Sequence, residues 1–372
     1  MASSPTTDQL QALCDSISTV HPDVIQNHIL TKLDGQTLVV IASASSQLRS
    51  LSLQDNLWRQ ICTSTWPSTN NPRVQTLIST FPAAHRSFFS DSFPVLDCQI
   101  RKSYSKHAAN QFDDSSVLDT TELISAVDIH YQNNPILSKV VETETVTGWF
   151  QFPPFRIDLL DEKQRVPTPT KFASETKALI KQLEENLTLS WIIIDSNGKR
   201  AVNLSSRWPI SVEQHWLTRE VHVKYAAVVI GSDHGRWWQS WSTREFVECE
   251  VTVTLGGEEG GEMSVREVYM QMKDLEERSL NGRESLVILR RAVGMGKRSG
   301  RRDVGKERYK EFMKKKIERK EGKERMGMAL CRACVCCLLV AVAFWPVFSE
   351  SGIDLTLKLP EPDGERRFGI YT

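Results

Sequence analysis

The residues best placed for chemistry are four cysteines close together in the sequence, Cys331, Cys334, Cys336 and Cys337. The Cys-x-x-Cys spacing of the first two is half of a zinc motif, in which four ligands surround the metal. A second pair at zinc-finger distance does not follow. Because the surrounding stretch is apolar, reversible acylation of a cysteine beside a membrane fits this pattern better than zinc binding.

Catalytic motifs are missing from the sequence. The histidines lie far apart, and there is no Gly-x-Ser-x-Gly, no phosphate-binding Walker loop and no His-Glu-x-x-His. An enzyme whose active site carries no motif is the alternative to a protein that works by binding. We therefore expect no catalytic residue, no metal and no cofactor.

A set of apolar residues in the range 20–62 is the best candidate for binding. Pro22 suits the first turn of a helix, and Ile25, Ile29 and Leu33 then fall on one face at i, i+4 and i+8. We expect Asp34-Gly35 to end this helix and Thr37 to cap the next. These residues either form the core of a small helical bundle or present part of their face to a partner. The full set is Pro22, Val24, Ile25, Ile29, Leu30, Leu33, Leu38, Leu57 and Trp58.

A second candidate site is an aromatic loop between two expected strands. It contains Arg236, Trp237, Trp238 and Trp241. Trp and Arg are favoured at the centres of protein interfaces, so this loop could bind a target protein. The alternative is that the three tryptophans fold back as core.

The elements around these residues indicate an α+β protein. Helical spacing continues to Phe89, and alternating apolar residues then predict strands, among them Leu187, Leu189, Trp191 and Ile193. Asn197-Gly198 and the glycines of 256–261 predict hairpin turns. We expect an antiparallel sheet or sandwich that folds independently of the helices.

We divide the chain into a disordered leader with a short helix (1–19), a three-helix module (20–62), a helical extension (63–104), a linker (105–120), a β-rich domain (121–273), a basic helical tail (274–325), a possible membrane anchor (326–348) and a polar tail (349–372).

Charge is unevenly distributed. Between Arg290 and Arg325 there are 16 Lys and Arg against 6 Asp and Glu, although the whole chain has a net charge of +0. A solvated helix with i, i+4 pairs explains this run better than nucleic-acid binding, which needs more aromatic residues for stacking. The apolar segment 326–348 follows, and the positive-inside rule would place the basic run in the cytosol. A buried helix or an unstructured hydrophobic tail is the alternative.

The order of apolar residues over 20–62 resembles the F-box, a short three-helix module. The residues that carry the resemblance are Pro22-Asp23-Val24-Ile25, Ile29-Leu30, Leu33, Leu38, Leu48 and Leu57-Trp58. Two positions depart from the family pattern: His21 replaces the usual Leu, and Leu48 replaces the usual Trp of the middle helix. Further peptides resemble one subgroup of plant F-box proteins, namely Trp66-Pro67-Ser68-Thr69, Phe88-Phe89-Ser90-Asp91-Ser92-Phe93-Pro94, Asn186-Leu187-Thr188-Leu189-Ser190-Trp191, His215-Trp216-Leu217-Thr218 and Leu280-Asn281-Gly282-Arg283.

This resemblance implies a function. In F-box proteins the apolar residues bind a Skp-type adaptor, which bridges to a cullin, and the rest of the chain binds the protein to be ubiquitinated. We therefore expect a non-catalytic substrate receptor of a cullin-type ubiquitin ligase, in the cytoplasm or nucleus or anchored to a membrane with its body in the cytosol. The alternative is a membrane-tethered interaction protein that does not assemble into a ligase.

Overall fold

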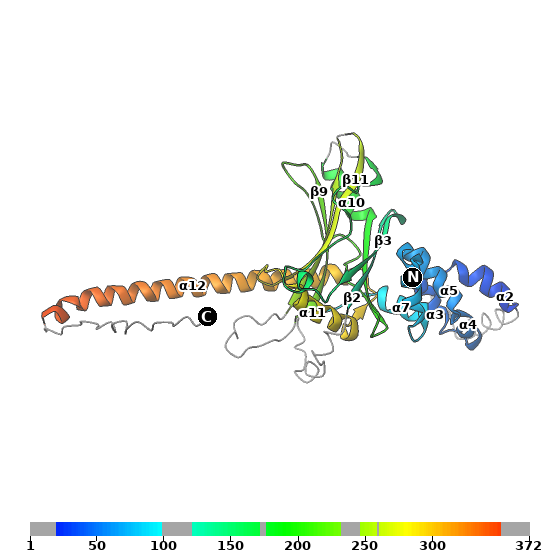
Figure 1. The fold of residues 1–372 in the computed structure, drawn as a ribbon, viewed down its shortest axis with the longest axis horizontal. Coiled ribbons are helices and arrows are strands. Elements are labelled where there is room, and N and C mark those ends of the chain that lie inside the picture. Colours follow the sequence, from blue (N-terminus) through cyan, green and yellow to red (C-terminus); the bar gives the residue numbers. More distant parts are fainter. Residues whose placement is uncertain (1–19, 99–120, 172–175, 232–245, 259, 351–372) are drawn as a thin grey trace, which may run out of the picture. The chain divides into compact units, whose positions relative to one another are not determined.

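The computed structural model describes residues 20–98, 121–171, 176–231, 246–258 and 260–350 (Figure 1). The chain divides into a large unit, Met1–Lys316, and a small one, Ile317–Thr372. Short helices come first and two sheets follow, which confirms the α+β fold. The helices before the sheets are α2 (Pro22–Val24), the π-helical turn η1 (Ile25–Ile29), the 3-10 turn η2 (Leu30–Lys32), α3 (Gly35–Ile41), α4 (Ser46–Ser52), α5 (Asp55–Thr65), the 3-10 turn η3 (Pro67–Asn70), α6 (Pro72–Ser79) and α7 (Ala84–Ser92).

The first helical segment is not the regular α-helix that the i, i+4 spacing predicted. Pro22 begins α2 as expected, but the Leu30 N–H then bonds to the Ile25 carbonyl, five residues back. This wider π turn shifts the phase of the side chains. As a result Ile25 and Leu30 share the buried side, whereas Ile29 is 46% exposed.

The next helix, α3, is capped by Asp34 and not by Thr37. The Asp34 carboxylate accepts a hydrogen bond from the Thr37 N–H at 2.7 Å, and this bond lowers the pKa of Asp34. Gly35 follows directly, and a Cβ at this position would overlap the Phe89 ring of α7. Asp34-Gly35 therefore begins a helix packed closely against α7, instead of ending the previous one.

Two six-stranded sheets form the sandwich. The first has the order β12-β1-β7-β6-β2-β3, and the second β4-β11-β10-β9-β8, with β5 also paired to β11. All pairs are antiparallel except β1 with β7. The strands are β1 (Val95–Leu96), β2 (Glu122–Tyr131), β3 (Asn134–Glu144), β4 (Arg156–Asp158), β5 (Val166–Lys171), β6 (Leu187–Asp195), β7 (Arg200–Asn203), β8 (Ser211–Gln214), β9 (Val221–Ile230), β10 (Phe246–Gly256), β11 (Glu262–Asp274) and β12 (Arg298–Ser299).

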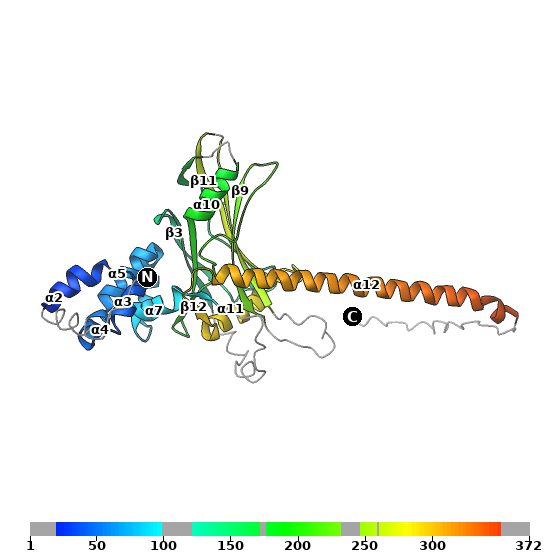
Figure 2. The same cartoon turned by 180° about the vertical axis from the view of Figure 1, so that it is seen from behind.

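The facing sides of the two sheets make the main core. Trp191 of β6 and Tyr225 of β9 are its largest fully buried side chains, and the alternating residues of β6 point into it as predicted. The hairpins expected at Asn197-Gly198 and over 256–261 join β6 to β7 and β10 to β11. The short strands β1 and β12 pair with each other at one edge, from outside the expected β-rich range (Figure 2).

The outer side of the first sheet packs on the helical block. Ile124, Ile192 and Ala201 belong to the same apolar cluster as Trp58 and Phe89. Asp128 of β2 accepts hydrogen bonds from the backbone N–H (2.9 Å) and the hydroxyl of Ser68. The two parts therefore share buried contacts within one compact unit, and independent folding of the β-rich region stays a prediction.

Three further helices complete the fold. Trp149 and Phe150 lie in the short helix α9 (Gly148–Gln151), inside the range predicted to be rich in strands. A helix that the sequence did not suggest, α10 (Thr176–Asn186), precedes β6. Asn281 begins α11 (Gly282–Met295), because it forms a reciprocal capping box with Glu284.

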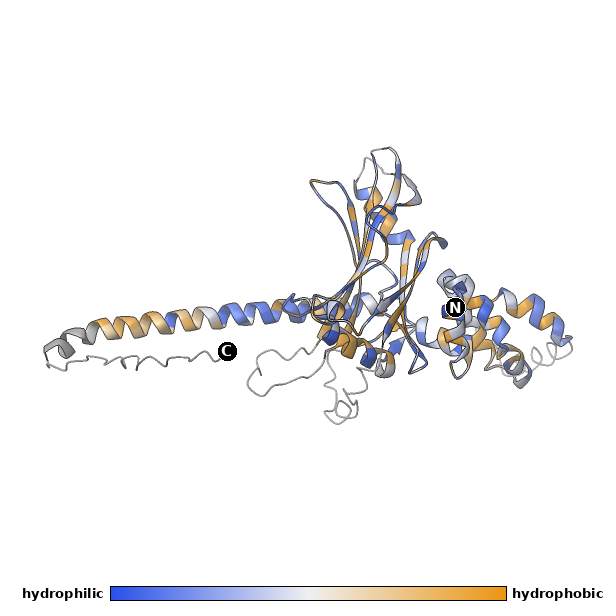
Figure 3. Cartoon of the chain, in the orientation of Figure 1, coloured by the Kyte–Doolittle hydropathy of each residue, from blue (hydrophilic) through white to orange (hydrophobic). Residues whose placement is uncertain are grey.

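The basic run is more ordered and more buried than expected. It includes β12 and the start of α12 (Val304–Glu350). Phe312 is fully buried with Val228 and Phe246 on the outer side of the second sheet. Arg308 also pairs with Asp97 at 2.6 Å. Hydropathy changes along α12 from hydrophilic to hydrophobic (Figure 3), so only its first turns serve as a packing element.

Candidate functional site

The nine candidate binding residues of the helical module divide into core and surface. Pro22, Val24 and Ile29 are exposed, and Leu33 is half-buried. The buried members, which form the core of the module, are Ile25, Leu30, Leu38, Leu57 and Trp58. Only the exposed members can touch a partner without unfolding the module, and the five buried members form its core. Contact of the exposed members with a partner stays a prediction.

The exposed apolar residues of the module define what we call the docking surface: Val24, Ile29, Val39, Val40 and Leu53. The last three were not among the predicted site residues. Helix α3 buries Gly35 and Leu38, which places Val39 and Val40 on its outward side. The sequence did contain a signal for these residues. Val39 and Val40 are apolar neighbours in a helix, so at least one of them must interrupt the polar face that a surface helix usually has.

The docking surface is held on a well-packed base. The Trp58 indole N–H donates to the Ser52 carbonyl at 2.8 Å, and its ring contacts Phe89 with 5.3 Å between centroids. Leu53 follows Ser52 directly, and the Gln54 side chain accepts a hydrogen bond from Gln26 of the π turn. These contacts join the segment that carries Leu53 to the one that carries Ile29.

The predicted target-binding residues Arg236, Trp237, Trp238 and Trp241 lie outside the described residues. Within the described part, large exposed apolar side chains occur at two other places of the sandwich. Trp149 and Phe152 lie at α9, and Trp216 and Leu217 lie in the loop between β8 and β9. His215-Trp216-Leu217-Thr218 was one of the peptides noted for its resemblance, but Trp216 was not predicted as a binding residue.

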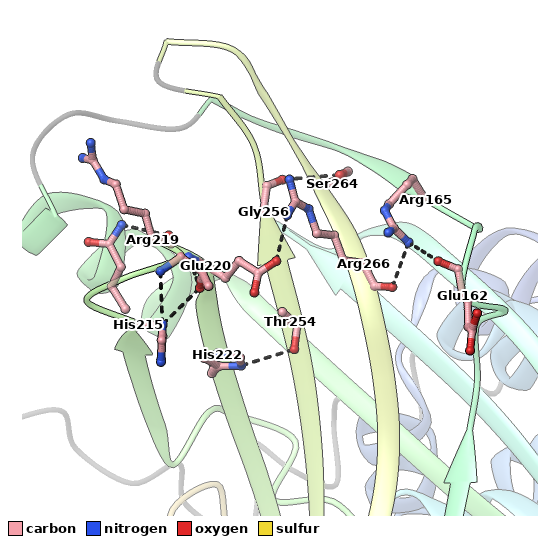
Figure 4. Close-up of polar contacts among 12 residues, drawn as sticks. Glu162, Arg165, His215, Arg219, Glu220, His222, Thr254, Gly256, Ser264 and Arg266 are labelled. Atoms are coloured by element: carbon pink, nitrogen blue, oxygen red, sulfur yellow. Dashed lines mark hydrogen bonds and ion pairs between the residues drawn. The ribbon is translucent and has the colours of Figure 1, made fainter.

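The β8–β9 loop, residues 215–220, is a tight turn fixed by polar contacts (Figure 4). His215 donates its N–H to the Glu220 carbonyl at 2.8 Å and accepts one from the Thr218 N–H on its ring nitrogen at 3.2 Å. Arg266 of β11 pairs with the Glu220 carboxylate at 2.7 Å. The loop therefore presents Trp216, 85% exposed, from a rigid base.

Histidine and cysteine chemistry finds little support in the geometry. His215 and His222 come within 6.2 Å of each other, measured between ring centroids, and each ring hydrogen-bonds a threonine, Thr218 and Thr254 respectively. Among the residues that the structure describes, no three His, Cys, Asp or Glu side chains gather as a metal site. The four cysteines of α12 are all exposed.

The second half of α12 exposes its apolar side chains. Leu338, Leu339 and Val342 are each more than half exposed. In the described part of the chain, α12 is the one helix whose length and composition would allow it to cross a membrane. Its basic first half precedes this apolar stretch directly.

Comparison with known proteins gives three similar chains from Arabidopsis thaliana. F-box protein At3g44326 is 43% identical over 84% of this chain and 84% of its own length. F-box protein At2g27310 is 40% identical over 86% of this chain and 92% of its own length. The probable F-box protein At2g36090 is 44% identical over 85% of this chain and 88% of its own length. No protein-family model and no solved structure match the chain.

Proposed function

The chain belongs to the F-box proteins of plants, and we propose that it is the substrate receptor of a cullin-type ubiquitin ligase. The observation that carries the proposal is the docking surface, in which five large apolar side chains stay exposed on a helical module whose own core is complete. A contiguous exposed apolar patch is typical of a protein-binding site. Val39 and Val40 are neighbours in α3, and the Gln26–Gln54 hydrogen bond brings the segments of Ile29 and Leu53 together. The partner is a Skp-type adaptor, which connects the chain to a cullin.

The receptor itself carries out no bond chemistry in this proposal. It holds a target protein near a ubiquitin-loaded enzyme and so raises the local concentration of the reacting groups. The shared core of the helical module and the first sheet supports this role. A rigid connection keeps a bound target at a fixed distance from the adaptor, because Asp128 and Ser68 join the two parts through buried hydrogen bonds.

The sandwich supplies the surface for the target. We assign this surface to the β8–β9 loop, where Trp216 and Leu217 are exposed on a loop held by Glu220 and Arg266. An exposed tryptophan on a rigid base loses little conformational entropy on binding and is a frequent interface hot spot. The loop of Trp237, Trp238 and Trp241 remains a second proposal for the same role.

Replacing Trp216 with Ala is expected to weaken target capture by at least about tenfold, since a hot-spot truncation costs about 2 kcal/mol or more. Adaptor binding should not change, because Trp216 lies on the sandwich and not on the helical module. Trp149→Ala, which removes an equally exposed tryptophan, is the matched control. If Trp216→Ala captures every target as well as the wild type does, the β8–β9 loop is not the target-binding surface.

Proximity labelling in plant cells tests the whole proposal. The full chain, fused to a labelling enzyme, is compared with and without proteasome inhibition. True targets are expected to increase in the labelled set when the proteasome is inhibited, and the increase should disappear when the docking surface is mutated. A labelled set that does not respond to inhibition supports the alternative, a tethered interaction protein outside a ligase.

We also propose that the apolar half of α12 anchors the protein to a membrane, with the basic half in the cytosol. The segment 326–348 is 23 residues long, close to the ~20 that span a bilayer. Arg332 lies near its beginning, where a long side chain can reach the interface. The basic run before it satisfies the positive-inside rule.

Replacing both Leu338 and Val340 with Lys is expected to move the protein from the membrane pellet to the soluble fraction after alkaline carbonate extraction. Each charge near the centre of a bilayer costs about 2.5–3.5 kcal/mol on insertion scales. Lys314→Leu, in the basic half, is the control and should leave the distribution unchanged. A wild-type protein that carbonate alone extracts would contradict the anchor.

A further inference from the structure

Two neighbouring cavities lie between the helical block and the first sheet, and both have Phe93 and Arg207 in their walls. One has a volume of about 150 Å³ and is otherwise polar, with His130 and Asn133 among its lining residues. The other, of about 240 Å³, is lined by Gln36, Trp208 and Arg302 among others. Drug-sized ligands usually need at least about 300 Å³, but a phosphate group fits in either cavity.

Arg207, which is partly buried, and Arg302, which is exposed, differ from the partly buried Arg200 and Arg308 in their partners. Arg200 and Arg308 each pair with a carboxylate, Asp91 and Asp97, at 2.7 and 2.6 Å. Arg207 and Arg302 instead lie over aromatic rings. The Arg207 guanidinium is 5.0 Å from the Phe93 centroid, and that of Arg302 is 4.1 Å from the Trp208 centroid. Neither cavity, as the described residues line it, contains an Asp or Glu.

Among the described lining residues, no carboxylate offsets the charges of Arg207 and Arg302. Burial lowers the pKa of Arg207, and the nearby charge of Arg302 lowers it further. The pKa of His130 is lowered as well, by burial and by Arg207, so this ring is neutral and can donate or accept one hydrogen bond. Arg301, which also lines the larger cavity, is already paired with Glu307.

The loop that carries Arg207 is fixed in an unusual conformation. Arg207 has φ of 64°, in the left-handed region that is strained for a residue with a side chain. Its N–H donates to the Ser205 hydroxyl, which itself donates to the Leu189 carbonyl at 2.6 Å. Ser205 is fully buried. Strain held in place by a buried hydrogen-bond network is typical of binding sites.

We propose that the larger of these cavities binds a phosphate monoester, with Arg207 and Arg302 as the charged ligands of the phosphate group. Guanidinium groups bind phosphate oxygens through paired hydrogen bonds, and stacking on Phe93 and Trp208 holds them in place for this. A bound dianion would offset the charge of both arginines. The phosphate is carried either by a small molecule or by a phosphorylated side chain of a partner, and the site is separate from the docking surface.

Titration calorimetry of the full chain in mild detergent tests the proposal, with inorganic phosphate as the probe and ionic strength held constant. Loss of a hydrogen-bonded charge is expected to weaken binding by about 10- to 100-fold in Arg207→Gln and Arg302→Gln. Arg156→Gln should change the affinity by less than about twofold, since Arg156 lies on β4 outside both cavities and is paired with Asp158 and Glu267. Arg302 is exposed, so its variant reports binding even if Arg207→Gln fails to fold.

Two esters then identify the source of the phosphate. Glycerol 2-phosphate represents small molecules, and a short phosphoserine peptide represents a modified protein. The ester that binds more tightly indicates the source, and either should bind more weakly to Arg302→Gln. The proposal is overturned if the wild type binds neither phosphate nor the esters, or if Arg302→Gln binds them as well as the wild type does.

Discussion

Replacing both Ile29 and Val40 with Asp is expected to weaken binding of a Skp-type adaptor by more than about 100-fold. Each substitution would bury an unpaired carboxylate in the proposed interface, at a cost of several kcal/mol. Both residues are exposed, 46% and 67% respectively, so the free protein has no reason to unfold. The measurement is co-purification with the adaptor, together with a circular dichroism spectrum that matches the wild type.

Two controls make this result specific. Val146→Asp places the same charge on an apolar residue that is 53% exposed but lies outside the helical module, and it should bind the adaptor normally. Leu38→Asp, at a fully buried position, should unfold the module and lower the melting temperature. Full-strength adaptor binding by the double variant would show that the docking surface is elsewhere.

The second large effect concerns Asp128, the buried carboxylate between the sheet and the helical block. Burial raises its pKa to about 6, although the hydrogen bonds from Ser68 act in the opposite direction. The folded state therefore binds this proton more tightly than the unfolded state does. The contribution of Asp128 to stability is complete below pH 3.8, its ordinary pKa, and is lost as the pH rises to about 6, by about 3 kcal/mol.

Asp128→Asn removes this loss, because the amide stays neutral and can still accept from the Ser68 N–H and donate to its hydroxyl. We expect the unfolding free energy of the variant, minus that of the wild type, to grow by about 2.4 kcal/mol between pH 4 and pH 7. Urea unfolding of the full chain at several pH values measures this difference. A difference that does not change with pH for Asp128→Asn would mean that Asp128 is not desolvated.

Much of the fold followed from local patterns in the sequence. The alternation of Leu187, Leu189, Trp191 and Ile193 identified the buried side of β6, and Asn197-Gly198 identified its turn. Pro22 marked the first helical residue. Each of these signals acts over a few residues, through the pleat of a strand, the conformation of a turn or the fixed φ of proline.

The errors came from interactions that the local pattern does not carry. The π turn at Ile25–Ile29 changes which side chains are buried, and Ile25 and Leu30 pack in the same apolar cluster as residues of α5 and α7. The strands β1 and β12 have only two residues each, too few for an alternating pattern, and they are recognised only by their pairing with each other. The basic run was expected in solvent, but Phe312 and Arg308 find partners far away in the sequence.

The candidate site was also only partly predictable, because local patterns do not show which residues pack against distant parts of the chain. The sequence identified the helical module, yet five of its nine proposed contact residues turned out to be buried. An apolar pattern states that residues avoid water, but it does not distinguish a core from an interface. The cationic cavities could not be predicted at all, because Phe93, Arg207 and Arg302 come together only in three dimensions.

Direct titration of the purified wild-type chain with a Skp-type adaptor tests the central claim. We predict a one-to-one complex with a dissociation constant of about 1 µM or lower, which corresponds to about −8 kcal/mol. This strength is expected of an apolar surface of several large side chains that become fully buried. No detectable complex at an adaptor concentration of about 100 µM, a hundred times this constant, with the chain folded by circular dichroism, would contradict the assignment as a ligase receptor.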